Sequence, residues 1–350
     1  MGAPRRLALR GRRRDSRDAC TGLTGKNRFT AGGGCPITAD RPHPGLRRLG
    51  PQANRVPSVA SPAAAATPAD PASLEQVVRD IGIPSCPKVL VDLRTELARD
   101  EPRLPMLAGL ASSDVALSAG LLKLANSALM GLSRKVDSVE QAFVMLGMQT
   151  CMSLLTEIVL RKTLPSEGLA LTRFWDVSAK RAHAMSLLAR HLIHVDGALA
   201  HSVGLFCDSG IPILIRRYVT PASYLVTLAE ANQCEDRLFT DVEQARHRMD
   251  HTIVGGLLAN MWGLSAAAQV AIRSHHDYSL LAPGSRLSEA ARELVALSLI
   301  VERIIQTYAG LNRHVEWEKG GAAAMGALEL DAASFKAWEA EAHALFDRMG

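Results

Sequence analysis

From about residue 73 onward, apolar residues recur every three or four positions, and this periodicity restricts the fold more than any other feature of the sequence. Val89, Leu90, Leu93 and Leu97 give a first clear example. No stretch alternates polar and apolar residues between turn signals, as a half-buried strand would. Aromatic residues make up only 4% of the chain, so Leu and Ala, both strong helix formers, must provide much of the core. The sequence therefore predicts an all-α fold.

Capping signals divide this region into separate helices. Ser113 and Asp114 are good N-caps for a following helix, and Ser138 with Gln141 forms a capping-box signature. A long helical segment then covers residues 139–160 and is interrupted near Gly147. Further helices are expected at residues 104–110, 115–127, 174–192, 199–206, 222–231, 242–248, 253–262, 266–274, 287–308 and 332–346. No fixed-period repeat is evident, which argues against a solenoid.

Residues 1–70 differ in composition from the rest of the chain. They are rich in Arg, Gly, Pro and Ala and lack an apolar period, so they cannot bury enough surface to offset the entropy of ordering. Three interpretations are open: a disordered tail, an arm for nucleic acid or a membrane surface, or an upstream stretch included by a misplaced start codon. We favour a functionally silent tail, because a nucleic-acid arm would usually interleave aromatic residues and only Phe29 is present.

The positive charge of the chain is concentrated in the same segment. Residues 1–55 contain twelve Arg and one Lys against three Asp, a net charge of +10, which leaves −5 for the remaining 295 residues. A mildly acidic fold does not suggest nucleic-acid binding. Six scattered cysteines without a C-x-x-C pair argue against a zinc ribbon or a disulfide framework. No apolar run reaches 18 residues and no signal-peptide core follows the first arginines, so we expect a cytoplasmic protein with no membrane association.

An ordered set of short motifs runs along the helical region. Its first half lies in Ser113–Gly131, with a motif at Leu124, Ala125, Asn126, Ser127 and Gly131, and in Val139–Gly147, which ends on the motif residue Gly147. Its second half consists of Phe174-Trp175, Gly204–Gly210, His251 with Gly255, Trp262-Gly263-Leu264 and His275-His276-Asp277. These dozen or so anchors, in this order across residues 80–280, resemble the HDOD domain family.

The resemblance implies a helical fold related to HD-superfamily metal phosphohydrolases. It also implies a bacterial signalling or regulatory module, the role generally assigned to HDOD proteins. Members of this family usually lack demonstrated hydrolase activity. We therefore expect a tail over residues 1–70, an HDOD-like helical domain over residues 71–284, and a helical extension over residues 285–350 that packs on it.

The resemblance further places the ligands of an HD-type metal site, and this chain departs from that pattern at two of them. Val177 stands where a His is expected two residues after Trp175, and Cys207-Asp208 replaces the His-Asp doublet. His251 matches the third ligand, and His275 or His276 the fourth; Glu302 is the nearest candidate for a further acid. An isopropyl group has no lone pair, and a thiolate suits Mg²⁺ or Mn²⁺ poorly. We expect a vestigial pocket formed by Val177, Cys207, Asp208, His251, His275 and His276, with no bound metal, no cofactor and no catalytic residue.

Three functions follow as hypotheses. The leading one is a non-enzymatic regulatory module that acts through a signalling protein partner or a small-molecule ligand. The alternative is an active metal phosphohydrolase that uses Cys207, Asp208, His251 and His275. The third is a nucleic-acid binder that uses the arginine-rich tail.

Other chemistry finds little support in the sequence. His183 and His191 lie eight residues apart near one helix face; we expect no carboxylate beside them and a structural role for both. The chain contains no dinucleotide fingerprint, P-loop or nucleophile elbow.

Overall fold

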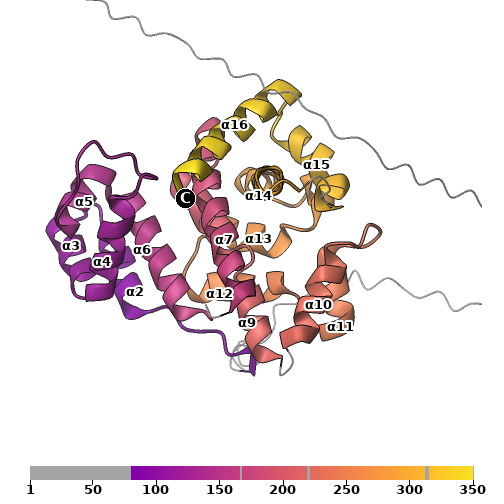
Figure 1. Ribbon diagram of the computed structural model, residues 1–350, viewed down its shortest axis with the longest axis horizontal. Coiled ribbons are helices and arrows are strands. Elements are labelled where there is room, and N and C mark those ends of the chain that lie inside the picture. Colours follow the sequence, from indigo (N-terminus) through magenta and orange to yellow (C-terminus); the bar gives the residue numbers. More distant parts are fainter. Residues whose placement is uncertain (1–79, 166–167, 219–220, 312–314, 350) are drawn as a thin grey trace, which may run out of the picture. The chain divides into compact units, whose positions relative to one another are not determined.

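The computed structural model describes residues 80–349 apart from 166–167, 219–220 and 312–314, and these residues lie within one compact unit, Ala66–Gly350. The described residues form helices and loops and include no strand (Figure 1). The all-α prediction is therefore confirmed. The tail expected over residues 1–70 lies outside the described residues.

The helices follow one another with short connections. Their bounds are α2 Lys88–Leu97, α3 Leu104–Ser112, α4 Val115–Ala125, α5 Val139–Leu146, α6 Met148–Thr163, α7 Leu169–Leu188, α8 Gly197–Phe206, α9 Gly210–Arg217, α10 Pro221–Ala231, α11 Phe239–His247, α12 His251–Met261, α13 Ala266–Ser274, α14 Glu289–Tyr308, α15 Val315–Ala327 and α16 Ala332–Met349. Two short 3₁₀ helices, Ala189–His191 and Tyr278–Leu281, follow α7 and α13. Helices α9 and α15 were not expected from the sequence.

The predicted capping signals act at the positions where the helices begin. The side chain of Asp114 accepts hydrogen bonds from the first turn of α4, at 2.8 Å from the amide of Ala116. Ser138 caps α5 through the amide of Gln141, at 3.1 Å. Gly147, at φ +85°, separates α5 from α6, because glycine tolerates positive φ far better than other residues. These caps and the break at Gly147 confirm the corresponding expectations.

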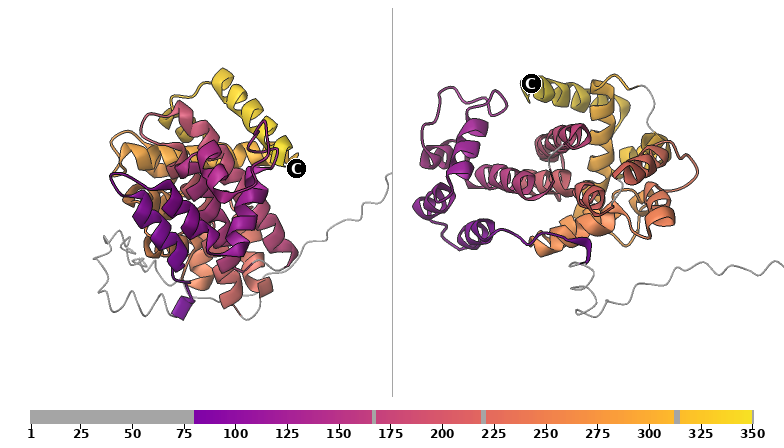
Figure 2. Two further views of the ribbon diagram at one scale, coloured as in Figure 1. Left: turned by 90° about the vertical axis from the view of Figure 1, so that its left-hand side faces the viewer. Right: turned by 60° about the horizontal axis from the view of Figure 1, so that its bottom comes forward.

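Helix α6 connects two groups of helices. It packs against α2, α4 and α5 on one side and against α8 on the other. Figures 1 and 2 show the earlier helices, in indigo and purple, on one side of α6, and the later helices on the other. A second connection is the indole nitrogen of Trp262, at the end of α12, which donates to the carbonyl of Pro84 at 3.1 Å.

The family motif at residues 124–127 closes the loop that follows α4. Asn126, the C-cap of α4, donates its amide to the carbonyl of Val136 at 2.9 Å and accepts from the amide of Val136 at 2.8 Å. Ser127 turns back to the carbonyl of Leu124, at 2.6 Å. One side chain thus satisfies both backbone groups of a residue ten positions further along the chain.

Replacing Asn126 with alanine is therefore expected to lower the free energy of unfolding by about 1–3 kcal/mol, because two backbone groups of the half-buried loop lose their partner. Urea denaturation measures this loss. Asn260→Ala, at an exposed position near the end of α12, is the matched control and should stay within about 0.5 kcal/mol of wild type. Equal effects of the two substitutions would contradict the bracing role of Asn126.

Two neighbouring helices, α7 and α8, approach each other closely at a glycine. A Cβ added at Gly204 would lie 2.8 Å from the Cα of Ala182 and 3.0 Å from the carbonyl carbon of Arg181. Only a residue without a side chain permits this approach. The close packing brings the end of α8 beside the middle of α7, where part of the candidate site lies.

Helix α14, within the expected C-terminal extension, packs against α7, α13 and α15. Its buried face is built from leucine, isoleucine and valine, with Leu297, Ile300 and Val301 fully enclosed. The expected boundary at residue 284 stays a prediction.

One segment of the described residues, Gly197–Arg217, is long and apolar enough to cross a membrane. It corresponds to α8 and α9, and 67% of its apolar window is buried inside the protein. Core helices commonly combine such length and apolarity, so this segment is weak evidence for a membrane span.

Candidate functional site

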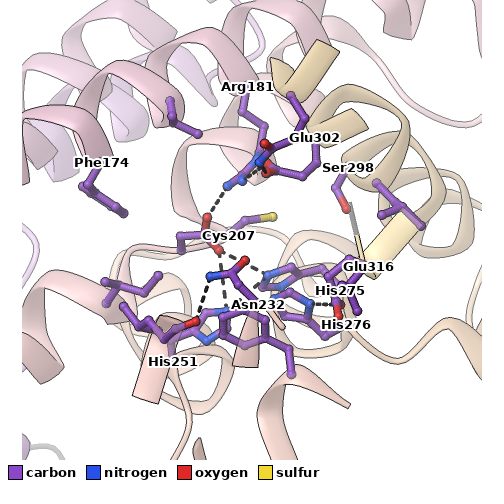
Figure 3. Close-up of a pocket in the computed structure, with 18 of the residues that line it drawn as sticks. Phe174, Arg181, Cys207, Asn232, His251, His275, His276, Ser298, Glu302 and Glu316 are labelled. Carbon is purple, nitrogen blue, oxygen red and sulfur yellow. Dashed lines mark hydrogen bonds and ion pairs between the residues drawn. The ribbon is translucent and has the colours of Figure 1, made fainter. Parts of the chain in front are cut away.

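The candidate site is a pocket of about 520 Å³ lined by residues 173–316, where the second half of the expected HDOD domain meets helices of the C-terminal region. Figure 3 shows Arg181 and Glu302 on one side of the pocket, the histidines 251, 275 and 276 on the other, and Cys207 between them. Asp208 lies in the short turn between α8 and α9. This volume falls within the range of small-molecule sites, roughly 300–1,000 Å³.

The pocket floor brings together three groups that the resemblance matched to ligand positions of an HD-type metal site. Oδ1 of Asp208 lies 3.3 Å from Nε2 of His275 and 3.6 Å from Nε2 of His251. The two histidine Nε2 atoms are 3.3 Å apart. A nitrogen of His276 completes a cluster of four groups whose ligand atoms all lie within 4.8 Å of one another.

Local structure fixes each of these side chains. His251 is the first residue of α12, which Asp250 caps through the amide of Ile253 at 2.8 Å. His275 is the C-cap of α13, and its Nδ1 lies 2.8 Å from the carbonyl of Ile272. Since a carbonyl only accepts, Nδ1 of His275 donates, and Nε2 of its neutral ring carries a lone pair directed into the cluster.

The other oxygen of Asp208 is bound by an arginine. Nη1 of Arg181 lies 2.5 Å from Oδ2 of Asp208, and Nη2 of the same guanidinium contacts Glu302. The Arg181 side chain is only 8% exposed, so its charge is enclosed between these two carboxylates. Arg181 lies on α7 four residues after Val177, which places both on the same helix face.

The charges around Asp208 determine its protonation. Burial alone would raise the pKa of Asp208, but Arg181 and the charged His251 hold that pKa well below its usual range. Asp208 is therefore ionised at neutral pH. At the neighbouring residue the effect of burial prevails. It raises the pKa of the Cys207 thiol to about 12, so this side chain remains protonated.

The two histidines of the floor differ in charge. Burial would lower the pKa of His251, but Glu243, 2.7 Å from its Nδ1, together with Asp208 and Asp250, raises this pKa to about 9. Burial and the neighbouring His276 lower the pKa of His275 to about 4. At neutral pH a charged His251 thus donates from Nε2 to the lone pair of a neutral His275.

His276 belongs to a second set of contacts at the edge of the cluster. Its Nδ1 lies 2.7 Å from Glu316 of α15, which also accepts from the hydroxyl of Tyr278 at 2.8 Å and from Lys319 at 2.7 Å. Burial would raise the pKa of Glu316, but His276, Lys319 and Tyr278 lower it to about 2. The ring of His276 also stacks on Phe239, with centroids 4.6 Å apart.

The remaining predicted residues occupy different places. Val177 and Cys207 line the pocket, but among the described residues Cys207 is not part of the four-residue cluster. Glu302 also lines it, and contacts Arg181 as well as Gln306. The family-motif residues Leu124, Ala125, Asn126, Ser127, Gly131 and Gly147 do not line it. Among them, Asn126 and Ser127 close the loop after α4, and Gly147 separates α5 from α6.

Three charged residues of the site were missed in the sequence: Arg181, Glu243 and Glu316. The sequence did contain a signal for Arg181, which shares a helix face with the apolar residues Phe174 and Val177. A charge on a buried apolar face requires an ion-pair partner, so an acidic residue was to be expected beside it. No comparable signal marked Glu243 or Glu316, which reach the site from two helices far apart in the chain.

The expectation that no carboxylate lies beside His183 and His191 was wrong. Nε2 of His183 lies 3.1 Å from Glu157, and Nε2 of His191 lies 3.4 Å from Glu341. Both carboxylates come from other helices, α6 and α16, so their proximity depends on tertiary packing that the sequence pattern did not indicate.

The raised pKa of His251 predicts how stability depends on pH. A pKa raised from 6.5 to about 9 stabilises the fold fully below pH 6.5, and this contribution, at most about 3 kcal/mol, is lost as the pH rises through 9. Urea denaturation between pH 6 and 9.5 should therefore show falling stability. In Glu243→Gln, which removes the main cause of the raised pKa, the decline should be weaker. Equal pH slopes in both proteins would contradict a charged His251.

Comparison with known proteins agrees with this architecture. The HDOD domain family model matches residues 83–278, more than half of the chain. A protein from Treponema pallidum (strain Nichols), of uncharacterised function, is 26% identical over 202 residues, which cover 56% of this chain and 38% of that protein. The chain thus matches little more than a third of that relative's length.

Solved structures with the same fold cover most of the chain. A phosphohydrolase candidate from Shewanella amazonensis SB2B superposes with a TM-score of 0.60 at 21% identity, covering 80% of this chain and 98% of that one. An HDOD domain protein of unknown function from Geobacter sulfurreducens gives 0.58 at 21% identity, covering 80% and 99%. A signal-transduction candidate from Marinobacter aquaeolei VT8 gives 0.60 at 18% identity, covering 78% and 59%.

At these identities the structures establish the fold alone, while the family model covers the residues that build the pocket floor, from Asp208 to His276. The chain belongs to the HDOD domain family.

Proposed function

We propose that this protein is a non-catalytic signalling module in which Arg181 supplies the positive charge that a metal ion would bring to an HD-type site. In this proposal the pocket contributes to regulation by holding a small ligand, or by shaping a surface for a signalling protein partner. The observation that carries the proposal is the ion pairing of the enclosed Arg181 guanidinium with Asp208 and Glu302.

The residues present fit a catalytic metal ion poorly. Val177 has no donor atom, and Cys207 is a buried thiol with a pKa of about 12. The site already holds the positive charges of Arg181 and of protonated His251, and both would repel a divalent cation. Because ligands must lose their protons, the raised pKa of His251 would weaken metal binding at pH 7.

The rest of the pocket supports a binding role. Beyond the charged floor, its lining includes the apolar side chains of Phe174, Leu225 and Leu311 and the amide of Asn232. A mostly apolar wall with a few polar groups is the usual composition of a small-molecule site.

One observation favours the alternative, a metal-dependent phosphohydrolase. Zinc ligands bonded at 2.0–2.1 Å in tetrahedral geometry are about 3.3 Å apart. The separations among Asp208, His251 and His275, 3.3–3.6 Å, are close to this value. This second function would use these three residues, with Cys207 as a weaker candidate.

Hydrolysis assays distinguish the two functions. Full-length protein, supplied in turn with Mn²⁺, Mg²⁺, Zn²⁺ and Fe²⁺, is incubated with phosphomonoesters, phosphodiesters and cyclic dinucleotides. The proposal predicts the same background rate for wild type and Asp208→Asn. Metal-dependent turnover that Asp208→Asn abolishes and Glu341→Gln, at a distant ion pair, retains would establish the phosphohydrolase instead.

A further inference from the structure

A second cluster of metal-binding side chains lies where α6, α7 and α8 meet. It consists of Glu157, His183 and His201, one from each helix, and all three are buried, with His201 only 3% exposed. One ligand atom from each lies within 4.8 Å of those from the other two. None of the three lines the pocket that contains Asp208, so the cluster is a separate site.

The geometry of this cluster is close to that of a three-ligand zinc site. Oε2 of Glu157 lies 3.1 Å from Nε2 of His183 and 3.7 Å from Nε2 of His201. These values lie on either side of the separation of about 3.3 Å expected between tetrahedral zinc ligands. The two imidazole rings are nearly perpendicular, with an interplanar angle of 72°, so they do not stack on each other.

Hydrogen bonding within the described residues leaves this cluster unsatisfied. Neither ring nitrogen of His201 has a hydrogen-bond partner, and Oε2 of Glu157 also lacks one despite its proximity to the two imidazoles. Buried polar groups without partners are rare in folded proteins and require an explanation. An ion pair between Glu157 and His183 alone would leave the ring of His201 enclosed with no bonded nitrogen.

We propose that Glu157, His183 and His201 bind one divalent first-row transition metal ion, with Zn²⁺ as the best match. Two imidazole nitrogens and one carboxylate oxygen form a donor set that suits zinc, and three protein ligands leave one tetrahedral position open. The metal would give both Nε2 of His201 and Oε2 of Glu157, which lack a hydrogen-bond partner, a bonded neighbour.

The open position has room for an exogenous ligand. A pocket of about 270 Å³ is lined by His183 and His201 and also by the polar side chains of Gln149, Ser153 and Ser186. This lining contains no acidic residue and no lysine or arginine. Water, or a small anion that balances the remaining positive charge of the zinc–carboxylate unit, would therefore complete the coordination.

The location of the site gives the ion a structural consequence. Helix α6 packs on α2, α4 and α5 as well as on α8. A metal ion bound by α6, α7 and α8 would therefore stabilise the packing of the helices before α6 against those after it. Zinc binding should therefore raise the midpoint of thermal unfolding. This effect depends on the fold and not on the function proposed for the pocket around Asp208.

The test uses tag-free, full-length protein stripped of metal with a chelator and then titrated with ZnCl₂. We expect one Zn²⁺ per chain by elemental analysis, a higher unfolding midpoint, and a visible spectrum of four-coordinate Co²⁺ when cobalt replaces zinc. His201→Gln should weaken zinc binding by more than about 100-fold, since even residues that only support a ligand contribute about 10–100-fold.

Three variants locate the ion. Glu157→Gln should act like His201→Gln and serves as the second ligand variant if the first does not fold. His191→Gln, at a more exposed histidine beyond the end of α7, and Asp208→Asn should both retain full zinc affinity. Failure of wild-type protein to bind zinc would overturn the proposal, and so would zinc that is lost in Asp208→Asn but kept in His201→Gln and Glu157→Gln.

Discussion

Replacing Arg181 with methionine is expected to lower the free energy of unfolding by about 3–5 kcal/mol, the usual cost of removing one partner from a buried ion pair. The guanidinium is only 8% exposed and contacts Asp208 and Glu302 at once. Methionine fills much of the same space but leaves two carboxylates without their cation. Chemical denaturation of both proteins at pH 7 measures the difference.

The pH dependence of this difference in unfolding free energy distinguishes the loss of the ion pairs from a loss of packing. Arg181 lowers the pKa of Asp208 in the folded state, so its stabilising effect is present above the ordinary Asp pKa, about 4, and is lost as the pH falls further. The difference between wild type and Arg181→Met should therefore shrink in acid. Arg173→Met, at an exposed position on the same helix, should change stability by about 0.5 kcal/mol or less at either pH. If Arg181→Met behaves like this control, the ion pairs do not stabilise the fold.

Gly210→Ala is the second substitution with a large expected effect, a loss of about 3 kcal/mol or more. A Cβ at this position of α9 would lie 2.2 Å from the carbonyl oxygen of His251 and 3.0 Å from the amide nitrogen of Gly255. Both neighbours are backbone atoms of α12, so no side chain can move aside. The two helices must separate, and His251 would move with α12.

Gly109→Ala is the matched control for this substitution. Gly109 is exposed in α3, and a Cβ there would meet no atom within 4 Å. Alanine at that position should stabilise the protein by about 0.5–1 kcal/mol, because it restricts the unfolded chain and favours helix. The signs of the two changes in urea denaturation are therefore opposite. A neutral Gly210→Ala would show that α9 and α12 do not approach as described.

Much of the fold was predictable from local signals. Helices α4 and α5 begin at the expected caps, Asp114 and Ser138. Such a cap is visible in the sequence because its side-chain oxygen accepts a hydrogen bond from a backbone amide only two or three residues further along the chain. The break at Gly147 followed from one glycine. Helix α15 was missed because it is rich in Gly and Ala and carries a weak apolar period, and α9 because it is short and contains Pro212.

The candidate site was only partly predictable, since its parts depend on different interactions. Asp208, His251, His275 and His276 converge as the family resemblance implied. The partners that set their charge could not be located in the same way, because an ion pair such as His251 with Glu243 is fixed by how α11 packs on α12. Tertiary packing also joins Glu157, His183 and His201, whose sequence separations follow no metal-binding motif.

The most direct measurement of the central claim is a crystal structure of the protein grown with excess Mn²⁺, with anomalous diffraction recorded to locate the metal. The account predicts no anomalous peak within bonding distance of Asp208, and the Arg181 guanidinium bonded to both Asp208 and Glu302. A Mn²⁺ ion coordinated by Asp208, His251 and His275, with Arg181 displaced from the carboxylate, would contradict it.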